Sequence, residues 1–505
     1  MGKLLGNLPE FSNRLWVVAM VEVRSAGSRR QPLGWRVDAN ASSRRIRRRT
    51  SLGFQNLSFS GAPLIKSAPP GPKSQEHLAY QSAHEGSAVS YPKGMPMAIQ
   101  RAKGATIEDV DGNLYVDFFG GAGVMNVGHS NPAVVQAATK QIGELTHALD
   151  FPTPSRRQLV KRLSALLPKE LSRVSFGGPT GSDAVESAVK LAKYNTKRHP
   201  IIAFEGSYHG MTVGALSLTS GRAFREPFLP LLPEVHFVPY AYCYRCPFKR
   251  TPDKCGLECA EYLDHVIEDP HSGVGKPAAI IVEPIQGEGG SIVPPEKFLP
   301  RIRQICDQNE IVMIADEVQA GFCRTGKMFS FEHTNTIPDI VTMSKALGGI
   351  GLPISGMAYR EKWNTWPAGQ HIGTFRGNVT AYAAGAAALE FMVTSDLAAH
   401  ALHLGEHMLS LLREVQKDSE IMGDVRGKGL MLGVELVKDR ETKEPAPELA
   451  RRVRSACHRR GLLIEIGGHY NNVARFLPPL VLTEELAQRG VAVFADVVRE
   501  VEGSR

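Results

Sequence analysis

Two side chains in the middle of this sequence could do chemistry together. Lys345 follows the apolar segment 340–343, and a lysine in such a turn can form a Schiff base with a carbonyl cofactor if its pKa is depressed. Asp316 ends the apolar segment 311–315, where an isolated carboxylate is costly unless it meets a cation such as a protonated pyridine nitrogen. Taken singly, Lys345 is more typical of a solvated surface lysine, and Asp316 of a helix cap or a buried ion pair.

A glycine-rich turn supplies the third element. Small residues and Ser182 stand immediately before the helical stretch 184–194, in the segment 176–183. Backbone amides at a helix start, together with the serine hydroxyl, can bind a phosphate without any basic side chain. Such a start is usually only a cap. Because it precedes Asp316 and Lys345 in order, each at a strand end, the combination favours a phosphate-bearing carbonyl cofactor.

The elements that must position these groups are apolar runs of strand length. Segments 201–204, 278–282 and 311–315 are each followed by a helix-like stretch, which predicts a mostly parallel sheet covered on both faces. Functional groups should gather beyond the carboxyl ends of those strands. Polar residues do follow each run. An Asp-Gly hairpin signal within 104–118 and a mixed pattern from residue 427 onward indicate additional, smaller α+β structure.

Composition and charge exclude several classes of protein. The chain has 505 residues, of which 43% are hydrophobic, so disorder of the whole chain is excluded. No apolar run long enough for a membrane span occurs, and seven cysteines are typical of a reducing cytoplasm. Residues 1–75 hold 13 Lys and Arg against 3 Asp and Glu, whereas residues 76–505 hold 46 against 48. We therefore predict a basic, flexible extension over 1–75, with a transit peptide, a nucleic-acid-binding arm and an upstream reading-frame extension left open.

Over about residues 80–500 the sequence resembles the class III aminotransferases, which are fold-type I pyridoxal-phosphate (PLP) enzymes. The resemblance rests on motifs that occur in family order: Gly181-Ser182, Tyr208-His209-Gly210, 283–290, 316–321, Ser344-Lys345 and 373–378. It implies an α/β fold with a mostly parallel sheet in a large PLP-binding domain and a smaller α+β domain from the chain ends. We assign 76–135 to the N-terminal part of the small domain, 136–395 to the large domain and 396–505 to the C-terminal small domain.

The same resemblance implies roles for individual residues. Lys345 would carry the cofactor as a Schiff base and shuttle protons, Asp316 would pair with the pyridine nitrogen, and Tyr208 would stack on the ring. The remaining cofactor contacts would come from Gly181, Ser182, His209, Gln319 and, from the neighbouring subunit, Thr374. That last contact would make a homodimer with shared active sites the smallest active unit.

Substrate handling is also implied by the resemblance. Arg475 would grip the α-carboxylate of 2-oxoglutarate, and Glu288 would pair with Arg475 while an ω-amine donor is bound. Several stretches resemble diaminobutyrate:2-oxoglutarate aminotransferases, and Met211 stands where many 4-aminobutyrate enzymes carry an arginine. We therefore expect transfer of the 4-amino group of 2,4-diaminobutyrate, or of a related diamino or ω-amino acid, to 2-oxoglutarate. Racemisation, γ-elimination and carbon–carbon bond formation begin with the same proton abstraction and remain alternatives.

Two further features could indicate other functions, namely metal binding and nucleic-acid binding. Cys243, Cys246, Cys255 and Cys259 have metal-like spacing, but free thiols in an insertion are favoured and no metal site is assigned. The basic extension lacks interleaved aromatic residues and the body of the chain is not basic, so neither nucleic acid nor membrane is expected as a partner. A cytoplasmic location is expected.

Overall fold

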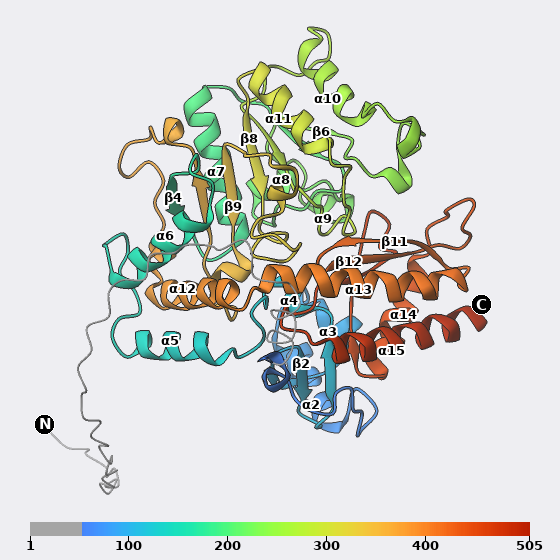
Figure 1. The fold of residues 1–505 in the computed structure, drawn as a ribbon. Coiled ribbons are helices and arrows are strands. Elements are labelled where there is room, and N and C mark those ends of the chain that lie inside the picture. Colours follow the sequence, from blue (N-terminus) through green and yellow to red (C-terminus); the bar gives the residue numbers. More distant parts are fainter. Residues whose placement is uncertain (1–52, 505) are drawn as a thin grey trace, which may run out of the picture. The chain divides into compact units, whose positions relative to one another are not determined.

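A seven-stranded sheet forms the centre of the computed structural model, which describes residues 53–504 (Figure 1). The strand order is β4-β10-β9-β8-β7-β5-β6, and only β10 runs antiparallel to its two neighbours. All residues of β5, β7, β8 and β9 are buried, which explains their continuous apolar sequences. The strands are Arg173–Phe176 (β4), Ile201–Phe204 (β5), Val235–Val238 (β6), Ala279–Val282 (β7), Val312–Asp316 (β8), Ile340–Met343 (β9) and Gly356–Tyr359 (β10). The predicted α/β class with a mostly parallel sheet is confirmed.

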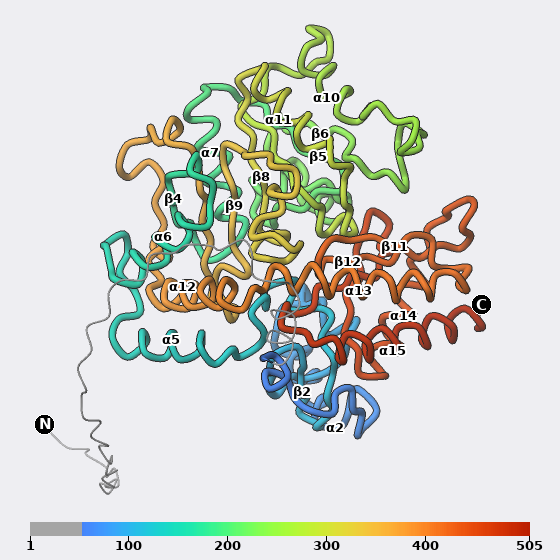
Figure 2. Tube along the Cα trace, in the orientation of Figure 1, coloured from blue at the N-terminus to red at the C-terminus, as the bar shows by residue number. Residues whose placement is uncertain are grey.

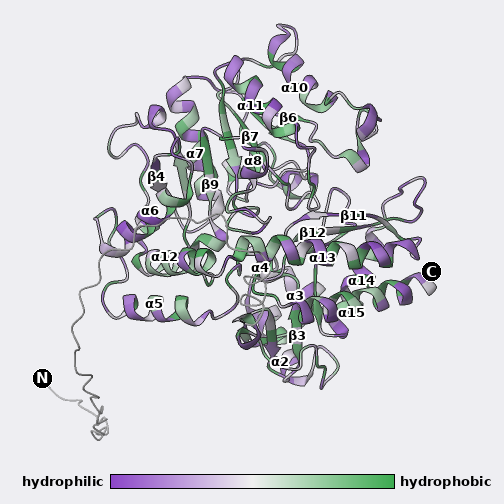
Figure 3. Ribbon diagram, viewed as in Figure 1, coloured by the Kyte–Doolittle hydropathy of each residue, from purple (hydrophilic) through white to green (hydrophobic). Residues whose placement is uncertain are grey.

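Helices cover both faces of this sheet. Alternate strand residues belong to two different apolar clusters: Ile281 and Ile314 pack with helix α7 (Gly181–Thr196), whereas Ile280 and Met313 share a cluster with residues of α10 (Glu258–Glu268) and α11 (Phe298–Gln308). Figure 3 shows the central strands in the hydrophobic colours beneath helices of mixed character. The alternation follows from the two-residue period of a strand.

Both ends of the described chain contribute to the smaller sheets. One has the order β1-β2-β3-β13, with β13 of the C-terminal part parallel to β3, and the other has the order β11-β12-β15-β14. Figure 2 shows the early segments in blue beside the C-terminal ones in red. Their bounds are Ile99–Lys103 (β1), Thr106–Asp109 (β2), Leu114–Asp117 (β3), Met422–Lys428 (β11), Met431–Leu436 (β12), Leu462–Leu463 (β13), Glu465–Gly467 (β14) and Val473–Phe476 (β15).

The remaining helices surround these sheets. Among residues 53–504, no helix combines the length and apolar character that a membrane crossing requires. The helices are Pro72–His84 (α2), Tyr91–Gly94 (α3), Gly120–Gly123 (α4), Pro132–Ile142 (α5), Pro154–Leu166 (α6), Val213–Leu218 (α8), Arg222–Arg225 (α9), Val379–Thr394 (α12), Leu397–Lys417 (α13), Pro447–Arg459 (α14) and Glu484–Gly503 (α15).

The folded part of the chain begins before the predicted boundary at residue 76. Phe54 and Ala62 are buried, and Leu64 exchanges backbone hydrogen bonds with Leu114 of β3. Residues 53–75 are therefore held by packing and by backbone pairing, and they do not belong to a flexible extension. The rest of that predicted extension, residues 1–52, lies outside the described residues. The boundaries at residues 135 and 395 remain predictions.

Candidate active site

A cavity of about 180 Å³ opens where the central parallel strands end. Its walls come from the loops after β5, β7, β8 and β9 and from the first residues of α7, because parallel strands present their carboxyl ends at one edge. Eight residues singled out in the sequence line it together: Gly181, Ser182, Tyr208, His209, Glu288, Asp316, Gln319 and Lys345. Segments far apart in sequence thus converge on one site.

Asp316 is held rigidly at the end of β8. His209 Nδ1 lies 2.7 Å from one carboxylate oxygen, and the hydroxyl of Thr342 donates to the other at 2.9 Å. The backbone N–H of Val318 donates to that second oxygen at 3.1 Å. Asp316 is only 4% exposed. These three hydrogen-bond donors compensate for the loss of water around its buried carboxylate.

Lys345 stands at the start of the short turn after β9, and its backbone lies in the left-handed region with φ of 47°. A non-glycine residue in this region is uncommon and is often found at functional sites. Burial lowers the pKa of the Lys345 amine to about 8, and the nearby Asp316 carboxylate opposes this shift. A substantial share of the amine is therefore neutral, and so nucleophilic, at physiological pH.

The opposite end of the cavity is the amino terminus of α7. Thr180 and Asp183 form a capping box there, which leaves the N–H groups of Gly181 and Ser182 pointing out of the helix start. The Ser182 hydroxyl accepts the N–H of Met211 at 3.3 Å. A Cβ at Gly181 would lie 2.8 Å from Val318, and one at Gly210 would collide with Ser182. Glycine at these two positions therefore allows the start of α7, the loop after β5 and the loop after β8 to approach one another closely.

The cavity fits a flat ring that carries a phosphate, as PLP does. His209 Nε2 and Gln319 Oε1 are buried and find no hydrogen-bond partner among the described residues. Buried polar atoms without partners are rare, and a bound group that supplies them accounts for both. An anionic carboxylate, a partly neutral lysine and a helix start also match the three polar parts of PLP, which are the ring nitrogen, the aldehyde and the phosphate.

Glu288 and Arg475 form an ion pair at the rim of this cavity. Arg475 Nη2 lies 2.7 Å from Glu288 Oε2, and the arginine side chain is 4% exposed against 30% for the glutamate. Arg475 Nε and Nη1 are buried without a hydrogen-bond partner among the described residues. The guanidinium therefore retains donors for a second carboxylate, and Glu288 is the more exposed partner of the pair.

Thr374 does not join the other predicted residues within one chain. Thr374 is exposed at the start of the short 3₁₀ helix Thr374–Gly377, and its backbone carbonyl accepts a hydrogen bond from His147 Nε2 at 2.7 Å. This position agrees with the sequence prediction that Thr374 reaches the site of a neighbouring subunit, which stays a prediction.

Two further carboxylates lie near the site. Glu283, directly after β7, accepts the N–H groups of Tyr208 and Gly287, and burial raises its pKa to about 7. The sequence analysis includes Glu283 among the polar residues that follow an apolar strand but gives it no role, and it does not identify Glu465. Glu465 lies beside Arg475 through strand pairing, for which no local motif exists.

The four closely spaced cysteines line a separate small cavity of about 20 Å³. All seven cysteines are free, and in the part of the chain that the structure describes no three His, Cys, Asp or Glu side chains are grouped as metal ligands. Burial raises the pKa of the Cys243 thiol, and that of Cys259 to about 12. The absence of a bound metal stays a prediction.

Known proteins resemble this chain in sequence and in structure. The family model of aminotransferase class III matches residues 88–498. A diaminobutyrate--2-oxoglutarate aminotransferase of Haemophilus influenzae is 43% identical over 411 residues, 80% of this chain and 90% of that protein. A leucine/methionine racemase of Thermococcus litoralis is 39% identical over 414 residues, 81% and 92% of the two chains. A PLP-bound amine transaminase from an uncultivated Pseudomonas species has a TM-score of 0.75 and 29% identity, covering 83% and 98% of the two chains.

The family model spans most of the chain, and relatives well above 30% identity cover four fifths of it. The cavity geometry fits the cofactor of that family. The chain therefore belongs to the class III aminotransferases and is a PLP-dependent aminotransferase.

Proposed function

We propose that this enzyme transfers the terminal amino group of a diamino or ω-amino acid, with 2,4-diaminobutyrate the preferred donor, to 2-oxoglutarate, giving an aldehyde and glutamate. The observation that carries this proposal is the Glu288–Arg475 ion pair beside Lys345. The reacting carbon of such a donor bears an amine but no carboxylate. Arg475 therefore has no donor carboxylate to bind, and Glu288 neutralises its charge instead. For 2-oxoglutarate, Glu288 swings aside and the free guanidinium binds the α-carboxylate.

Lys345 is proposed to hold the cofactor covalently through Nζ and to move the proton of the carbon that bears the reacting nitrogen. Its lowered pKa of about 8 leaves roughly a tenth of the amine neutral at pH 7, far more than for an exposed lysine. Asp316, fixed by His209 and Thr342, holds a negative charge toward the pyridine nitrogen. Bound PLP supplies an electron sink for the charge left on that carbon.

The other contacts are proposed to fix the cofactor in place. Gly181 and Ser182 would bind the phosphate through the helix start, and Tyr208 would lie on the ring. Gln319, whose Oε1 is buried without a partner among the described residues, would face the phenolic oxygen. His209 would act through Asp316, as a positioning residue.

Two observations support 2,4-diaminobutyrate as the donor: the names of similar proteins and the side chain at position 211. Several relatives carry the name diaminobutyrate--2-oxoglutarate aminotransferase or transaminase. Met211, next to the Ser182 cradle, is 46% exposed and uncharged. Met211 therefore cannot pair with the carboxylate of a 4-aminobutyrate donor. This favours a donor that is recognised by a side chain other than the one at position 211.

The test is an assay of glutamate formation from 2-oxoglutarate over a panel of diamines, ω-amino acids and α-amino acids. We expect the highest kcat/KM with L-2,4-diaminobutyrate and no turnover without keto acid. Because one relative is named a racemase, the same panel is examined for loss of optical activity in the absence of 2-oxoglutarate. Racemisation faster than glutamate formation would overturn the proposed reaction.

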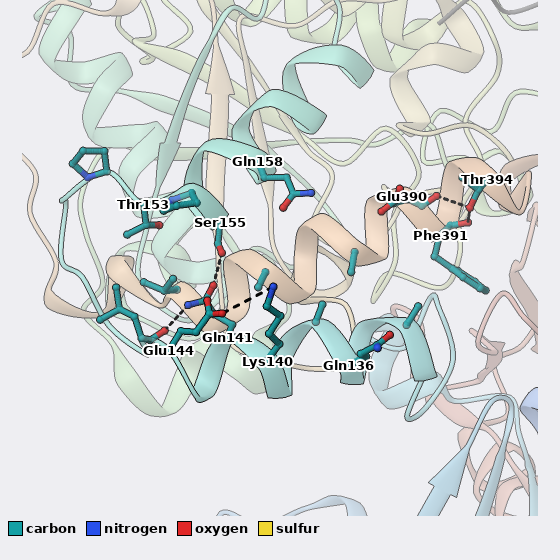
Figure 4. A pocket seen from close by; sticks show the side chains of 18 residues that line it. Gln136, Lys140, Gln141, Glu144, Thr153, Ser155, Gln158, Glu390, Phe391 and Thr394 are labelled. Atoms are coloured by element: carbon teal, nitrogen blue, oxygen red, sulfur yellow. Dashed lines mark hydrogen bonds and ion pairs between the residues drawn. The ribbon is translucent and has the colours of Figure 1, made fainter. Parts of the chain in front are cut away.

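The proposal includes a homodimer, and a groove of about 860 Å³ between α5, α6 and α12 is the surface that supports it (Figure 4). Figure 4 shows Lys140 on α5 and Glu144 just beyond its end, with Ser155 and Gln158 of α6 and Glu390 of α12 among the other residues that line the groove. Leu145, which lines the groove, is exposed, as are three large apolar residues close to it in the sequence: Ile142, Leu149 and Phe151. Exposed apolar clusters of this kind are typical of subunit interfaces.

A charge in the floor of this groove tests the dimer. Ala387→Glu, which places a carboxylate there, should shift the sedimenting species to the mass of one 55.0 kDa chain and weaken PLP retention, because Thr374 would no longer reach a partner site. Ala83→Glu on the exposed face of α2 is the matched control. A wild-type protein that sediments as a monomer at full activity would contradict the shared site.

A further inference from the structure

A second carboxylate stands beside the arginine of the active-site rim. In the antiparallel pair of β14 and β15, Glu465 is directly opposite Arg475. Residues in such a pair point to the same face of the sheet, with Cβ atoms about 4.5–5.5 Å apart. On its other side Arg475 is opposite Gly433, which has no side chain. Glu465 is therefore the neighbour that strand register places next to the guanidinium.

Glu465 does not form a close ion pair with either neighbouring arginine. Arg475 directs Nη2 to Glu288, and the closest approach of Arg454 to Glu465 is 3.9 Å from Nη1 to Oε1. Glu465 Oε1 accepts the neighbouring N–H of Ile466 at 2.9 Å. The residue is 8% exposed, and a buried carboxylate with so distant a cation is costly.

Two carboxylates and two guanidinium groups lie around this site, but only Glu288 and Arg475 are in close contact. Glu288 neutralises Arg475 at 2.7 Å, and Arg454 reaches Glu465 only at the limit of an ion pair. Burial raises the pKa of Glu465, with Glu288 adding to the shift and Arg475 opposing it. The phenol of Tyr91 lies near both carboxylates. Burial raises the pKa of Tyr91, and the negative charges of Glu465 and Glu288 raise it further. In the state proposed to accept an amine donor, the only ion pair of Glu465 among the described residues is thus the 3.9 Å contact with Arg454.

We propose that Glu465 is a specificity-determining residue that receives the second ammonium group of a diamino donor while Glu288 covers Arg475. This inference rests on the proposed function. In 2,4-diaminobutyrate the second ammonium is two carbons from the reacting carbon, which suits a carboxylate adjacent to the arginine of the same site. 2-Oxoglutarate has no ammonium group, so Glu465 would select among donors and would not select the acceptor.

The test is Glu465→Gln in the holoenzyme, which keeps the size of the side chain and removes its charge. We expect KM for L-2,4-diaminobutyrate to rise roughly tenfold or more. KM for 4-aminobutyrate, which has no second ammonium, and KM for 2-oxoglutarate should change by less than about threefold. Glu414→Gln on the exposed face of α13 is the control. Glu465→Asp should retain part of the preference for the diamino donor.

A second readout does not depend on turnover. Borohydride-reduced holoenzyme, wild type and Glu465→Gln, is titrated calorimetrically with L-2,4-diaminobutyrate and with 4-aminobutyrate. The wild type should bind the diamino acid more tightly, and the variant should lose that difference. A variant that keeps the preference, or one in which 2-oxoglutarate is affected most, overturns the inference and leaves Glu465 as a support of Arg475. A wild type that does not use diamino donors overturns the proposed function instead.

Discussion

His209 Nδ1 lies 2.7 Å from Asp316 Oδ2, although 107 positions separate the two residues in the chain. The contact joins the loop after β5 to the end of β8, across a sheet in which β7 stands between them. His209 thereby orients the carboxylate that faces the proposed site of the pyridine nitrogen, and its other ring nitrogen is buried without a partner among the described residues.

Replacing His209 by Gln should weaken cofactor binding and slow turnover. A hydrogen bond to a charged group contributes about 1.5–3 kcal/mol, so we expect kcat and PLP affinity each to fall roughly tenfold or more. PLP affinity can be measured by fluorescence quenching and kcat by glutamate formation. His199→Gln, at an exposed position beyond α7, should leave both unchanged. A His209→Gln enzyme with wild-type affinity and rate would remove the positioning role.

Replacing Lys345 by Ala should abolish the covalent attachment of PLP while noncovalent binding persists. The cradle at the start of α7 and Asp316 remain, but the amine that would hold the cofactor and move the proton is lost. We expect turnover to fall by several orders of magnitude. Borohydride followed by mass spectrometry should label the wild type at Lys345 and leave the variant unlabelled. Lys327→Ala, an exposed lysine, should be labelled and active like the wild type.

Attachment of PLP to the cofactor-free enzyme should depend on pH through Lys345. Burial lowers the pKa of this amine to about 8, and only the neutral form is nucleophilic. Below pH 8 the neutral fraction falls about tenfold per pH unit, so the rate should rise up to about pH 8 and then level off. Stopped-flow absorbance measures this rate. A rise that continues to pH 10 would mean that burial does not lower the pKa of Lys345.

Gly467→Ala should impair the acceptor half of the reaction selectively. A Cβ at Gly467 would lie 2.5 Å from Arg475 Nε and 3.0 Å from the Glu288 carbonyl, so the guanidinium must move. We expect KM for 2-oxoglutarate to rise about tenfold, because the bidentate grip on its carboxylate is lost. Gly86→Ala, where no atom lies within 4 Å, is the matched control. An unchanged KM would show that Arg475 does not bind the acceptor.

Protein purified without chelator should contain far less than one zinc or iron per chain. Metal ligation needs thiolates, whereas burial raises the pKa of Cys259 to about 12. Emission spectrometry measures the metal, and thiol titration in denaturant should find all seven cysteines reduced. One metal per chain that disappears in a Cys246→Ser variant would establish the site that the sequence analysis did not assign.

The class of fold and three parts of the candidate site, namely Lys345, Asp316 and the helix start at Gly181, could be predicted from local sequence, whereas the roles of the other site residues came from the family resemblance. Buried parallel strands such as β7 and β8 are continuous apolar runs, and the polar residues that follow them must meet at one edge of the sheet. The helix start at Gly181 is likewise a local signal. Local patterns did not predict that residues 53–75 are folded, since Phe54 and Ala62 are buried by contacts distant in sequence.

The sequence by itself determined which residues meet at the ends of the parallel strands, because strand length, apolar content and helix caps are properties of neighbouring residues. Only the tertiary structure decided that Glu465 stands opposite Arg475. The reason is register: a shift of one residue between β14 and β15 would turn Glu465 to the other face of the sheet, and no local pattern specifies that register.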